Sequence, residues 1–424
     1  MNELKMSELN KKTIRDIDLK GKRVLLRCDF NVPIDKKTGE ITDARRIEEA
    51  IPTIKYLIEQ GCKITLCSHL GKPKGKIVPE LSLKPVAKKL SELLGQEVQM
   101  AEDVIGPNAK EVRANLQEGE IALLENTRFH REETDNDPEY AKELAGDAEV
   151  FVNDAFGAAH RAHASTAGVA EHLPAVSGFL MEKELNILGN ALNNPERPFT
   201  AILGGSKVSD KIGVIDSLIE RVGKGGKILI GGGMAYTFFK SLGYNVGNSL
   251  CEPDKCDLAL ELMRKARENG VKLVLPEDTV IGKELNKDTE TQEVLCSEIP
   301  EGWAGFDIGP KTVEVFKKEL EGSKTVFWNG PLGAFEIEPF DKGTNSIAQV
   351  LAELEGAKTI IGGGDSGAAV EKAGLSDKMT HISTGGGASL EFIEGLKLPG
   401  VECLEDKEPC KKNCKECCDE GDER

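Results

Sequence analysis

Apolar and polar positions alternate along this chain with two periods, one typical of short strands and one typical of helices. In the first half, apolar runs at 24–27, 63–67, 121–124 and 150–152 end in polar or charged residues, and segments of helical periodicity such as 45–59 and 84–94 lie between them. Strands and helices that alternate at this spacing predict βαβ units built around a parallel sheet.

The second half repeats this pattern, but its apolar runs lead into glycines. Runs at 200–203, 227–230, 325–328, 359–361 and 381–383 are each followed by a glycine-bearing turn. The carboxyl ends of parallel strands lie at one edge of a sheet, where open α/β folds bind ligands. Structural glycines explain any one of these turns, but five together favour a site for a nucleotide's phosphates and base.

The turn at 359–366 passes from a β-branched run through three glycines to Asp365 and Ser366. Backbone N–H groups and the helix dipole at such a turn favour a phosphate, and a neighbouring carboxylate can hold the magnesium ion of that phosphate. The alternative is a tight turn in which Asp365 and Ser366 only cap a helix expected at 367–373.

Two lysines in the second half are a further candidate phosphate contact. Lys207 and Lys211 follow the turn at Gly204 and Gly205 four residues apart, which predicts that both lie on one face at the start of a helix. Helix N-termini usually favour acidic side chains, so two cations there indicate an anionic ligand rather than two solvated lysines. Cations, N–H groups and a metal-bound nucleotide are the components that phosphoryl transfer requires.

Cationic side chains of the first half cluster at or after strand ends. These candidates are Arg45, His69, Lys72, Arg128, His160, Arg161 and His163. Each alone is explained by a solvated surface charge, but their shared edge predicts a pocket for a small polyanion that carries phosphate and carboxylate groups. Asp29 and Asn31 add an acceptor and an amide suited to a hydroxyl. A metal pair at His160 and His163 is disfavoured because no carboxylate or cysteine lies at ligand spacing beside it.

Composition and charge narrow the class of protein. The chain has 424 residues, 39% of them hydrophobic and 30% charged, which predicts two domains. A net charge of −17 argues against a general binder of nucleic acid or anionic membranes. No apolar stretch reaches the length of a membrane span and no export signal is visible, so a cytoplasmic protein is expected.

The eleven cysteines fall into two groups. Six are scattered through the body and are expected to be reduced and mostly buried. Five lie in the last 22 residues, and four of these, Cys410, Cys414, Cys417 and Cys418, form a cysteine-rich tail at 409–424. That tail could bind a metal, form redox disulfides or be inert; we favour an inert tail because no second ligand cluster accompanies it.

Several nucleotide-binding classes can be tested against these residues. The P-loop pattern is absent, and the residues at 154–157 (DAFG) do not match the Asp-Phe-Gly of protein kinases. The glycines of 362–367 match a dinucleotide fingerprint, but the next strand ends in Thr384 and glycines instead of the acidic residue that binds a ribose. An NAD-dependent oxidoreductase and a non-catalytic nucleotide-binding module therefore remain the alternatives.

Eight ordered motifs give the chain a specific resemblance to phosphoglycerate kinase, collinear from about Thr13 to Leu404. They are 27–33 (RCDFNVP), 68–71 (SHLG), 124–129 (LENTRF), 154–157 (DAFG) with 160–163 (HRAH), 204–208 (GGSKV), 328–331 (WNGP), 362–365 (GGGD) and 383–388 (STGGGA).

The resemblance implies an α/β fold of two Rossmann-like domains with parallel sheets, joined by a helical hinge, and a C-terminal segment that returns to the first domain. The expected domains are 1–180 for phosphoglycerate with 390–408 packed on it, an interdomain helix at 181–194, and 195–389 for the nucleotide. The implied reaction is reversible phosphoryl transfer from 1,3-bisphosphoglycerate to Mg-ADP, giving 3-phosphoglycerate and ATP, by a monomer with Mg²⁺ as cofactor and no nucleic-acid or membrane partner.

The resemblance also implies a role for each matching residue. Those expected to hold the glycerate are Asp29, Asn31, Arg45, His69, Leu70, Gly71, Lys72, Arg128 and Arg161. Those expected to bind the nucleotide are Lys211, Gly231, Gly232, Gly305, Asn329, Glu336, Gly363, Gly364, Asp365 and Ser366, with Asp365 as the metal ligand. The expected catalytic residues are Arg45, Lys207, Gly364 and Gly386. Lys72 stands where the family often has arginine, so it keeps the charge but loses the bidentate fork.

Overall fold

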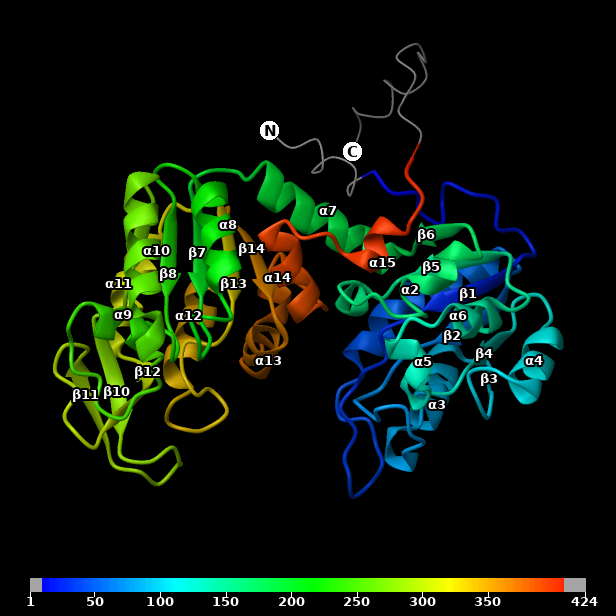
Figure 1. Cartoon of the computed structure of the whole chain (residues 1–424), viewed down its shortest axis with the longest axis horizontal. Helices are drawn as coiled ribbons and strands as arrows, with labels where there is room; N and C mark the ends of the chain where they lie inside the picture. Colours follow the sequence, from blue (N-terminus) through cyan, green and yellow to red (C-terminus); the bar gives the residue numbers. More distant parts are fainter. Residues whose placement is uncertain (1–9, 408–424) are drawn as a thin grey trace, which may run out of the picture. The chain divides into compact units, whose positions relative to one another are not determined.

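The computed structural model describes residues 10–407, which fold into two compact units (Figure 1). Within the described residues, the first unit comprises 10–154, Ala162–Glu182 and 400–407, and the second comprises Ala155–Arg161 and Lys183–Pro399. The domain boundaries expected from the resemblance stay a prediction, and the cysteine-rich tail at 409–424 lies outside the described residues.

A six-stranded parallel sheet forms the centre of the first unit, in the order β3-β4-β2-β1-β5-β6. Its strands are β1 (Arg23–Arg27), β2 (Lys63–Cys67), β3 (Val98–Met100), β4 (Ile121–Leu123), β5 (Val150–Asn153) and β6 (Ala175–Ser177). After their first residues the two central strands are buried on both faces and mostly apolar, as expected for a parallel sheet covered by helices.

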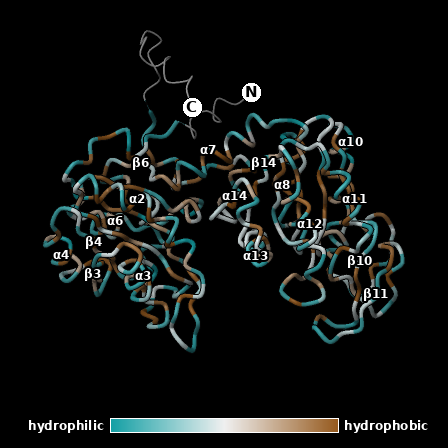
Figure 2. Tube along the Cα trace, turned by 180° about the vertical axis from the view of Figure 1, so that it is seen from behind, coloured by the Kyte–Doolittle hydropathy of each residue, from teal (hydrophilic) through white to brown (hydrophobic). Residues whose placement is uncertain are grey.

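Helices and short 3₁₀ turns connect the strands of the first unit. They are α2 (Arg45–Glu59), η1 (Pro79–Leu81), α3 (Lys84–Leu94), α4 (Pro107–Ala114), η2 (Thr127–Phe129), α5 (Arg131–Thr134), α6 (Pro138–Ala145) and η4 (Gly168–Glu171), with α15 (Pro399–Glu402) near the C-terminus. Helix α2 shows why the sequence folds this way, because its buried residues recur at helical spacing: Ile47, Ala50, Thr53, Ile54 and Leu57. The same alternation of hydrophobic and hydrophilic stretches runs along both units (Figure 2).

The two ends of the described chain meet in the first unit. The backbone N–H of Lys12 donates to the Glu405 carbonyl (2.7 Å), and that of Lys407 donates to the Asn10 carbonyl (2.6 Å). Lys11 pairs with Asp406 in an antiparallel bridge. The C-terminal segment therefore returns to the first unit, as the resemblance implied.

Helix α7 (Phe179–Asn193) runs from the first unit into the second. The backbone N–H groups of Leu180 and Met181 donate to the Oδ1 of Asp154 (2.9 and 3.1 Å). Asp154 therefore satisfies two amides in the first turn of the helix, which have no partners within the helix itself. The resemblance implied an interdomain helix at 181–194; the observed helix spans Phe179–Asn193.

The second unit is built around another six-stranded parallel sheet, in the order β15-β14-β13-β7-β8-β9. Its strands are β7 (Phe199–Leu203), β8 (Lys227–Ile230), β9 (Lys272–Val274), β13 (Thr325–Asn329), β14 (Lys358–Gly362) and β15 (His381–Ile382). All five strands that the sequence predicted to precede glycine turns belong to this one sheet, so their carboxyl ends share an edge. This confirms the predicted architecture of two parallel sheets.

A small antiparallel sheet, which the sequence did not predict, is inserted into the second unit. Its order is β11-β10-β12, from β10 (Asp278–Gly282), β11 (Thr291–Leu295) and β12 (Ala304–Ile308). The helices and turns of this unit are η3 (Phe156–Ala158), α8 (Ile212–Val222), α9 (Ala235–Ser241), η5 (Pro253–Lys255), α10 (Cys256–Glu268), α11 (Pro310–Leu320), α12 (Lys342–Glu353), α13 (Gly364–Lys372), η6 (Ser376–Lys378) and α14 (Gly386–Glu394). No helix among the described residues is long and apolar enough to cross a membrane.

Candidate functional site

Three loops at the carboxyl edge of the first sheet are tied together by side-chain hydrogen bonds. After β1, the Asn31 Oδ1 accepts from the backbone N–H of Gly71 (2.9 Å), which follows β2. After β4, the Nη1 of Arg128 donates to the Gly71 carbonyl (2.9 Å). The Nδ2 of Asn126 donates to the Leu70 carbonyl (2.7 Å). The structure therefore brings together four of the predicted glycerate residues, which follow three different strands: Asn31, Leu70, Gly71 and Arg128.

An ion pair between the buried Asp29 and the half-buried Arg46 lies beside these loops. The Nη1 of Arg46 on α2 donates to both carboxylate oxygens of Asp29 (2.9 Å each). Burial alone would raise the pKa of Asp29, but the neighbouring Arg46 and Arg27 and the backbone N–H of Asn31 hold it below its ordinary value. Asp29 is therefore an ionised acceptor inside the protein, as a residue that binds a hydroxyl requires.

His69 is buried with only 6% of its surface exposed and lies against a second arginine. Its Nδ1 is 3.1 Å from the Nη2 of Arg27, whose side chain is wholly buried. Burial is the largest cause that lowers the pKa of His69 well below 6.5, and Arg27, Arg128 and Arg46 lower it further against the opposing Asp29. His69 is thus neutral at physiological pH, and its inclusion among the cationic candidates was wrong.

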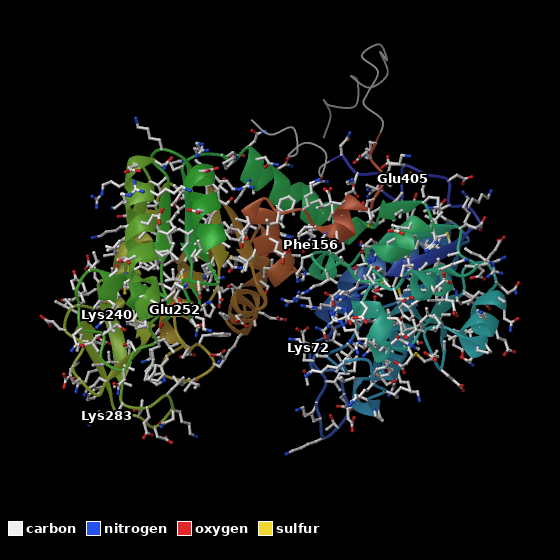
Figure 3. The ribbon with its side chains drawn as sticks, viewed as in Figure 1. Lys72, Phe156, Lys240, Glu252, Lys283 and Glu405 are labelled. Carbon is white, nitrogen blue, oxygen red and sulfur yellow. The ribbon has the colours of Figure 1, made fainter. Side chains whose placement is uncertain are left out.

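We name these seven residues the polar cluster of the first unit: Arg27, Asp29, Asn31, Arg46, His69, Gly71 and Arg128. Arg45 begins α2 directly before Arg46, and its backbone N–H donates to the Oδ1 of Asp43 (2.9 Å). Lys72 follows Gly71 and is exposed (Figure 3). Arg161 is also exposed and belongs to the segment that is part of the second unit.

The second unit contains a cavity of about 660 Å³ at the carboxyl edge of its parallel sheet. Six of the predicted residues line it: Lys207, Lys211, Gly232, Gly305, Glu336 and Asp365. Its wall also includes Tyr236, Leu250, Leu285, Phe306 and Leu332, which add apolar surface to the cavity. A cavity of this size that combines apolar lining with polar and charged groups is typical of a small-molecule site.

Glycines let the turns of this unit pack closer than any side chain allows. A Cβ on Gly204 would lie 2.0 Å from the Pro331 carbonyl oxygen, and one on Gly232, whose φ is +71°, would lie 2.6 Å from the Gly205 carbonyl oxygen. A Cβ on Gly231 would meet the side chain of Leu332 at 2.5 Å, and one on Gly305 would lie 2.0 Å from the Oη of Tyr236. Gly232 and Gly305 line the cavity, and all four glycines allow close approaches between the segments around it.

Both predicted lysines line the cavity, but the helix begins later than expected. Helix α8 starts at Ile212 with Lys211 at the N-cap position, so Lys207 lies in the preceding turn and not on the helix. The backbone N–H of Lys211 donates to the Val208 carbonyl (2.9 Å), which closes that turn and delays the helix. The prediction of one helical face was therefore wrong, although both side chains reach one cavity.

Lys211 is nearly buried and its Nζ donates to the Oδ1 of Asn329 (2.5 Å). Burial lowers the pKa of Lys211, whereas Asp210, Asp365 and Glu394 oppose that shift. The Nδ2 of Asn329 in turn donates to the Gly362 carbonyl (2.7 Å). Asn329 thus connects the lysine to the turn that precedes α13.

The N-termini of α13 and α14 converge. A Cβ on Gly386, the first residue of α14, would lie 3.1 Å from the backbone nitrogen of Gly364, the first residue of α13. A Cβ on Gly364 would meet no atom within 4 Å. Two sets of unsatisfied helix N–H groups are therefore close together, which favours a polyanion there.

Neither Asp365 nor Ser366 caps α13, so the capping interpretation of this turn was wrong. The N-cap is Gly363, whose φ of +108° only glycine adopts readily, and the helix starts at Gly364. Asp365 is exposed in the first turn and lines the cavity. The buried Ser366 Oγ accepts from the backbone N–H of Gly330 (2.7 Å), so its hydroxyl joins two turns.

The sequence analysis missed Arg27, Arg46, Tyr236 and Phe306. Arg46 directly follows a predicted site residue, Arg45, and Arg27 ends a predicted strand, so the positions of both in the sequence could have identified them as candidates. Tyr236 lies within α9 and Phe306 within β12, where the apolar pattern predicts core residues and gives no indication of a functional role. For metal binding, the described residues contain no group of three or more His, Cys, Asp or Glu side chains, so His160 and His163 do not form part of one.

Comparison with known proteins adds family information to this geometry. The family model described as phosphoglycerate kinase matches residues 14–396. The solved structure of phosphoglycerate kinase from Coxiella burnetii is 41% identical, with a TM-score of 0.81, and the match covers 93% of this chain and 98% of that one. The phosphoglycerate kinase from Pyrococcus horikoshii OT3 is 33% identical, with a TM-score of 0.80 and the same coverage of 93% and 98%.

Proposed function

The chain belongs to the phosphoglycerate kinase family, and from that premise we propose a division of the reaction between its two units. The protein is a phosphotransferase that moves a phosphoryl group reversibly between 1,3-bisphosphoglycerate and ADP, giving 3-phosphoglycerate and ATP. The polar cluster of the first unit binds the phosphoglycerate, and the cavity of the second unit binds the nucleotide. An oxidoreductase is not favoured by any comparison.

The observation that carries the nucleotide assignment is the composition of the 660 Å³ cavity. Lys207, Lys211 and Asp365 line its polar end, and the N-termini of α13 and α14 converge near Asp365. This end offers N–H donors and cations to phosphates, while Tyr236 and Phe306 offer an apolar surface to the base. On the same basis we propose that Asn329 and Glu336 contact the nucleoside.

The polar cluster suits the glycerate substrate for a different reason. Its arginines are oriented by hydrogen bonds to carbonyl and carboxylate oxygens, and such preorganised donors recognise phosphate and carboxylate groups well. Asp29 remains ionised and accepts from a substrate hydroxyl. Arg45, Lys72 and Arg161 are proposed to complete the site as cations.

The chemical step needs charge stabilisation but no general base. In the direction of ATP formation, an oxygen of the terminal phosphate of ADP attacks the acyl phosphate, the bond between phosphorus and the acyl oxygen breaks, and the carboxylate of 3-phosphoglycerate leaves. No proton is transferred. Lys207 and the N–H groups of Gly364 and Gly386 are proposed to stabilise the moving phosphoryl group, with Arg45 acting on the carboxyl side.

The residues fit a magnesium ion bound mainly by the nucleotide. Asp365 is an exposed carboxylate at the cavity, and magnesium in such sites typically takes one or two carboxylates together with substrate phosphates and waters. When bound, the ion would neutralise phosphate charge. Asp365 would hold and orient it beside Lys211, and Lys211 would remain charged in its nearly buried position because of these anions.

We also propose that the protein acts as a cytoplasmic monomer on these small molecules, without nucleic-acid or membrane partners. The family's role in glycolysis and the charge of −17 support this assignment. Light scattering during size-exclusion chromatography would test the oligomeric state, and a mass near twice 45.9 kDa would contradict it.

A coupled assay tests the proposed function. Formation of 1,3-bisphosphoglycerate from 3-phosphoglycerate and ATP is followed through a glyceraldehyde-phosphate dehydrogenase that consumes NADH. We expect turnover that requires magnesium and stops with EDTA. Turnover that is unaffected by EDTA would contradict the assignment of Asp365, and NADH consumption without the coupling enzyme would support the oxidoreductase instead.

A further inference from the structure

Arg27 is wholly buried near the proposed glycerate site, and each of its nitrogens has a partner. The Nε donates to the Oγ of Ser165 (2.7 Å), the Nη1 donates to the Cys28 carbonyl, and the Nη2 faces the Nδ1 of His69 at 3.1 Å. Ser165 is itself held, because its backbone N–H donates to the buried Oε1 of Glu133 (2.7 Å). The guanidinium therefore has one fixed orientation.

The contact with His69 has only one consistent proton arrangement. A guanidinium is always protonated in proteins and has no acceptor, so its Nη2 can only donate. The Nδ1 of His69 must therefore carry the lone pair, and the single ring proton of a neutral imidazole must lie on Nε2. A proton on Nδ1 would remove this hydrogen bond and set two N–H donors against each other, and if Nε2 kept its proton as well, two cations would be in contact inside the protein.

We propose that Arg27 is a positioning residue that locks His69 as the neutral Nε2–H tautomer, so that His69 offers phosphoglycerate a fixed N–H donor. This inference rests on the proposed glycerate site. The charged groups that face His69 are Arg27 and Asp29 after or on β1, Arg46 on α2 and Arg128 in η2. Asp29 is the sole carboxylate among them, and Arg46 already neutralises it with two hydrogen bonds.

The consequence concerns substrate binding across the physiological pH range. Histidine usually changes charge near pH 6.5, and a site that used a cationic histidine would lose affinity for an anion above that pH. With Arg27 in place, the donor on Nε2 is present at every pH in this range. The contribution of His69 to glycerate affinity therefore does not depend on pH between about 5.5 and 8.

The first test is spectroscopic and needs no substrate. The chain has six histidines, so long-range ¹H–¹⁵N spectra of histidine-labelled protein can be assigned with a His69→Gln variant. We expect the wild-type His69 to show the Nε2–H pattern, unchanged from about pH 8 to about pH 5.5. An Nδ1–H pattern, a mixture of tautomers or titration near the ordinary value would overturn the proposal while leaving the proposed function intact.

Arg27→Met tests the cause of this locking. We expect the variant to show mixed tautomers and a His69 that titrates, and its KM for 3-phosphoglycerate to vary with pH. Ser165→Ala is the matched control, because it removes a partner of the Nε of Arg27 but leaves the Nη2 contact, and it should keep the wild-type tautomer. An unchanged His69 spectrum in folded Arg27→Met would refute the role of Arg27.

A second pair of variants keeps the proposal testable if Arg27→Met does not fold. The amide nitrogen of glutamine can replace the Nε2 of histidine, and that of asparagine can replace the Nδ1. Because a hydrogen bond to a charged ligand is worth about 1.5–3 kcal/mol, we expect His69→Asn to raise the KM for 3-phosphoglycerate about tenfold or more, and at least about threefold more than His69→Gln. An asparagine variant that binds as well as the glutamine variant would contradict the assigned donor.

Discussion

The two proposed sites differ in the chemical groups that form them. The polar cluster of the first unit consists mainly of polar and charged side chains that are buried or half-buried and are joined by hydrogen bonds, such as Asp29 with Arg46. The proposed nucleotide site of the second unit combines glycine turns, the converging N-termini of α13 and α14, and the exposed side chains of Lys207 and Asp365. The first site therefore depends on side-chain partners, and the second depends on backbone position.

This difference decides how each site should respond to substitution. Removing a member of the first site leaves a buried charge or donor without its partner, so stability and binding should change together. Removing an exposed side chain from the second site should change catalysis alone. The predictions below examine this contrast, from the largest expected effect to the smallest.

Lys207→Ala should give the largest effect. Loss of one charged donor to a transition state typically lowers kcat by about 10²–10³-fold, and we expect a fall of this size with a free energy of unfolding within about 0.5 kcal/mol of wild type. Lys240→Ala is the control, since Lys240 is an exposed lysine of the same unit that does not line the cavity (Figure 3). Near-normal turnover of Lys207→Ala would remove its catalytic role.

Asp154 tests the energetic cost of buried charge in the first unit. Burial raises its pKa to about 6 from the ordinary 3.8, so the folded state binds this proton more tightly than the unfolded chain does. Its contribution to stability is therefore complete at low pH and is lost as pH rises from about 4 to about 6, which amounts to about 3 kcal/mol. Asp154→Asn keeps the Oδ1 acceptor for α7 but cannot ionise.

The measurement is chemical unfolding of both proteins at several pH values. We expect the asparagine variant to gain up to about 3 kcal/mol relative to wild type between about pH 4 and about pH 7. Because the two proteins share every other titratable group, the pH dependence that those groups cause cancels in the difference between their free energies of unfolding. A difference between the two proteins that stays constant with pH would show that Asp154 does not titrate as its burial requires.

Gly364→Ala tests whether the second site depends on backbone access. No protein atom lies within 4 Å of the added methyl, and a helical glycine replaced by alanine usually gains about 0.5–1 kcal/mol of stability. We nevertheless expect kcat to fall about tenfold, because the methyl would occupy space that a phosphate needs. Equal kcat values with higher stability would mean that this glycine has no catalytic role.

The sequence predicted regular structure well where apolar periodicity decides it. Helices α2 and α3 and strands β2 and β8 have the predicted bounds, because each is bounded by polar or turn-forming residues. The small sheet of β10, β11 and β12 was missed because its exposed β11 has no buried face to create a pattern. The pairing of its strands depends on tertiary contacts that local sequence does not specify.

The sequence predicted which types of residue form the two sites, but not which of these residues contact one another. The lysines and the glycine turns were identified, and the structure places Lys207, Lys211 and Asp365 at one cavity. The choice of Arg46 as the partner of Asp29, and the neutral state of His69, depend on which side chains meet across loops in the folded unit. The helix start at Gly364 depends on the positive φ of Gly363, which a run of three glycines leaves undetermined.

Lys72→Arg should give the smallest effect. Lys72 is exposed, so the change should leave stability within about 0.5 kcal/mol of wild type. A guanidinium can bind a phosphate with two parallel hydrogen bonds where an ammonium acts as a point charge, so we expect the KM for 3-phosphoglycerate to fall about two- to threefold. A KM for ADP that changes by the same factor would place Lys72 outside the glycerate site.

Separate titration of the two ligands against one variant of each unit tests the division of the reaction most directly. Calorimetry would measure 3-phosphoglycerate and Mg-ADP binding to Arg128→Met and Lys211→Met. We predict that Arg128→Met loses about tenfold or more in 3-phosphoglycerate affinity and keeps its ADP affinity, and that Lys211→Met shows the reverse. Equal losses of both ligands in either variant, or losses in the opposite sense, would contradict the assignment of one substrate to each unit.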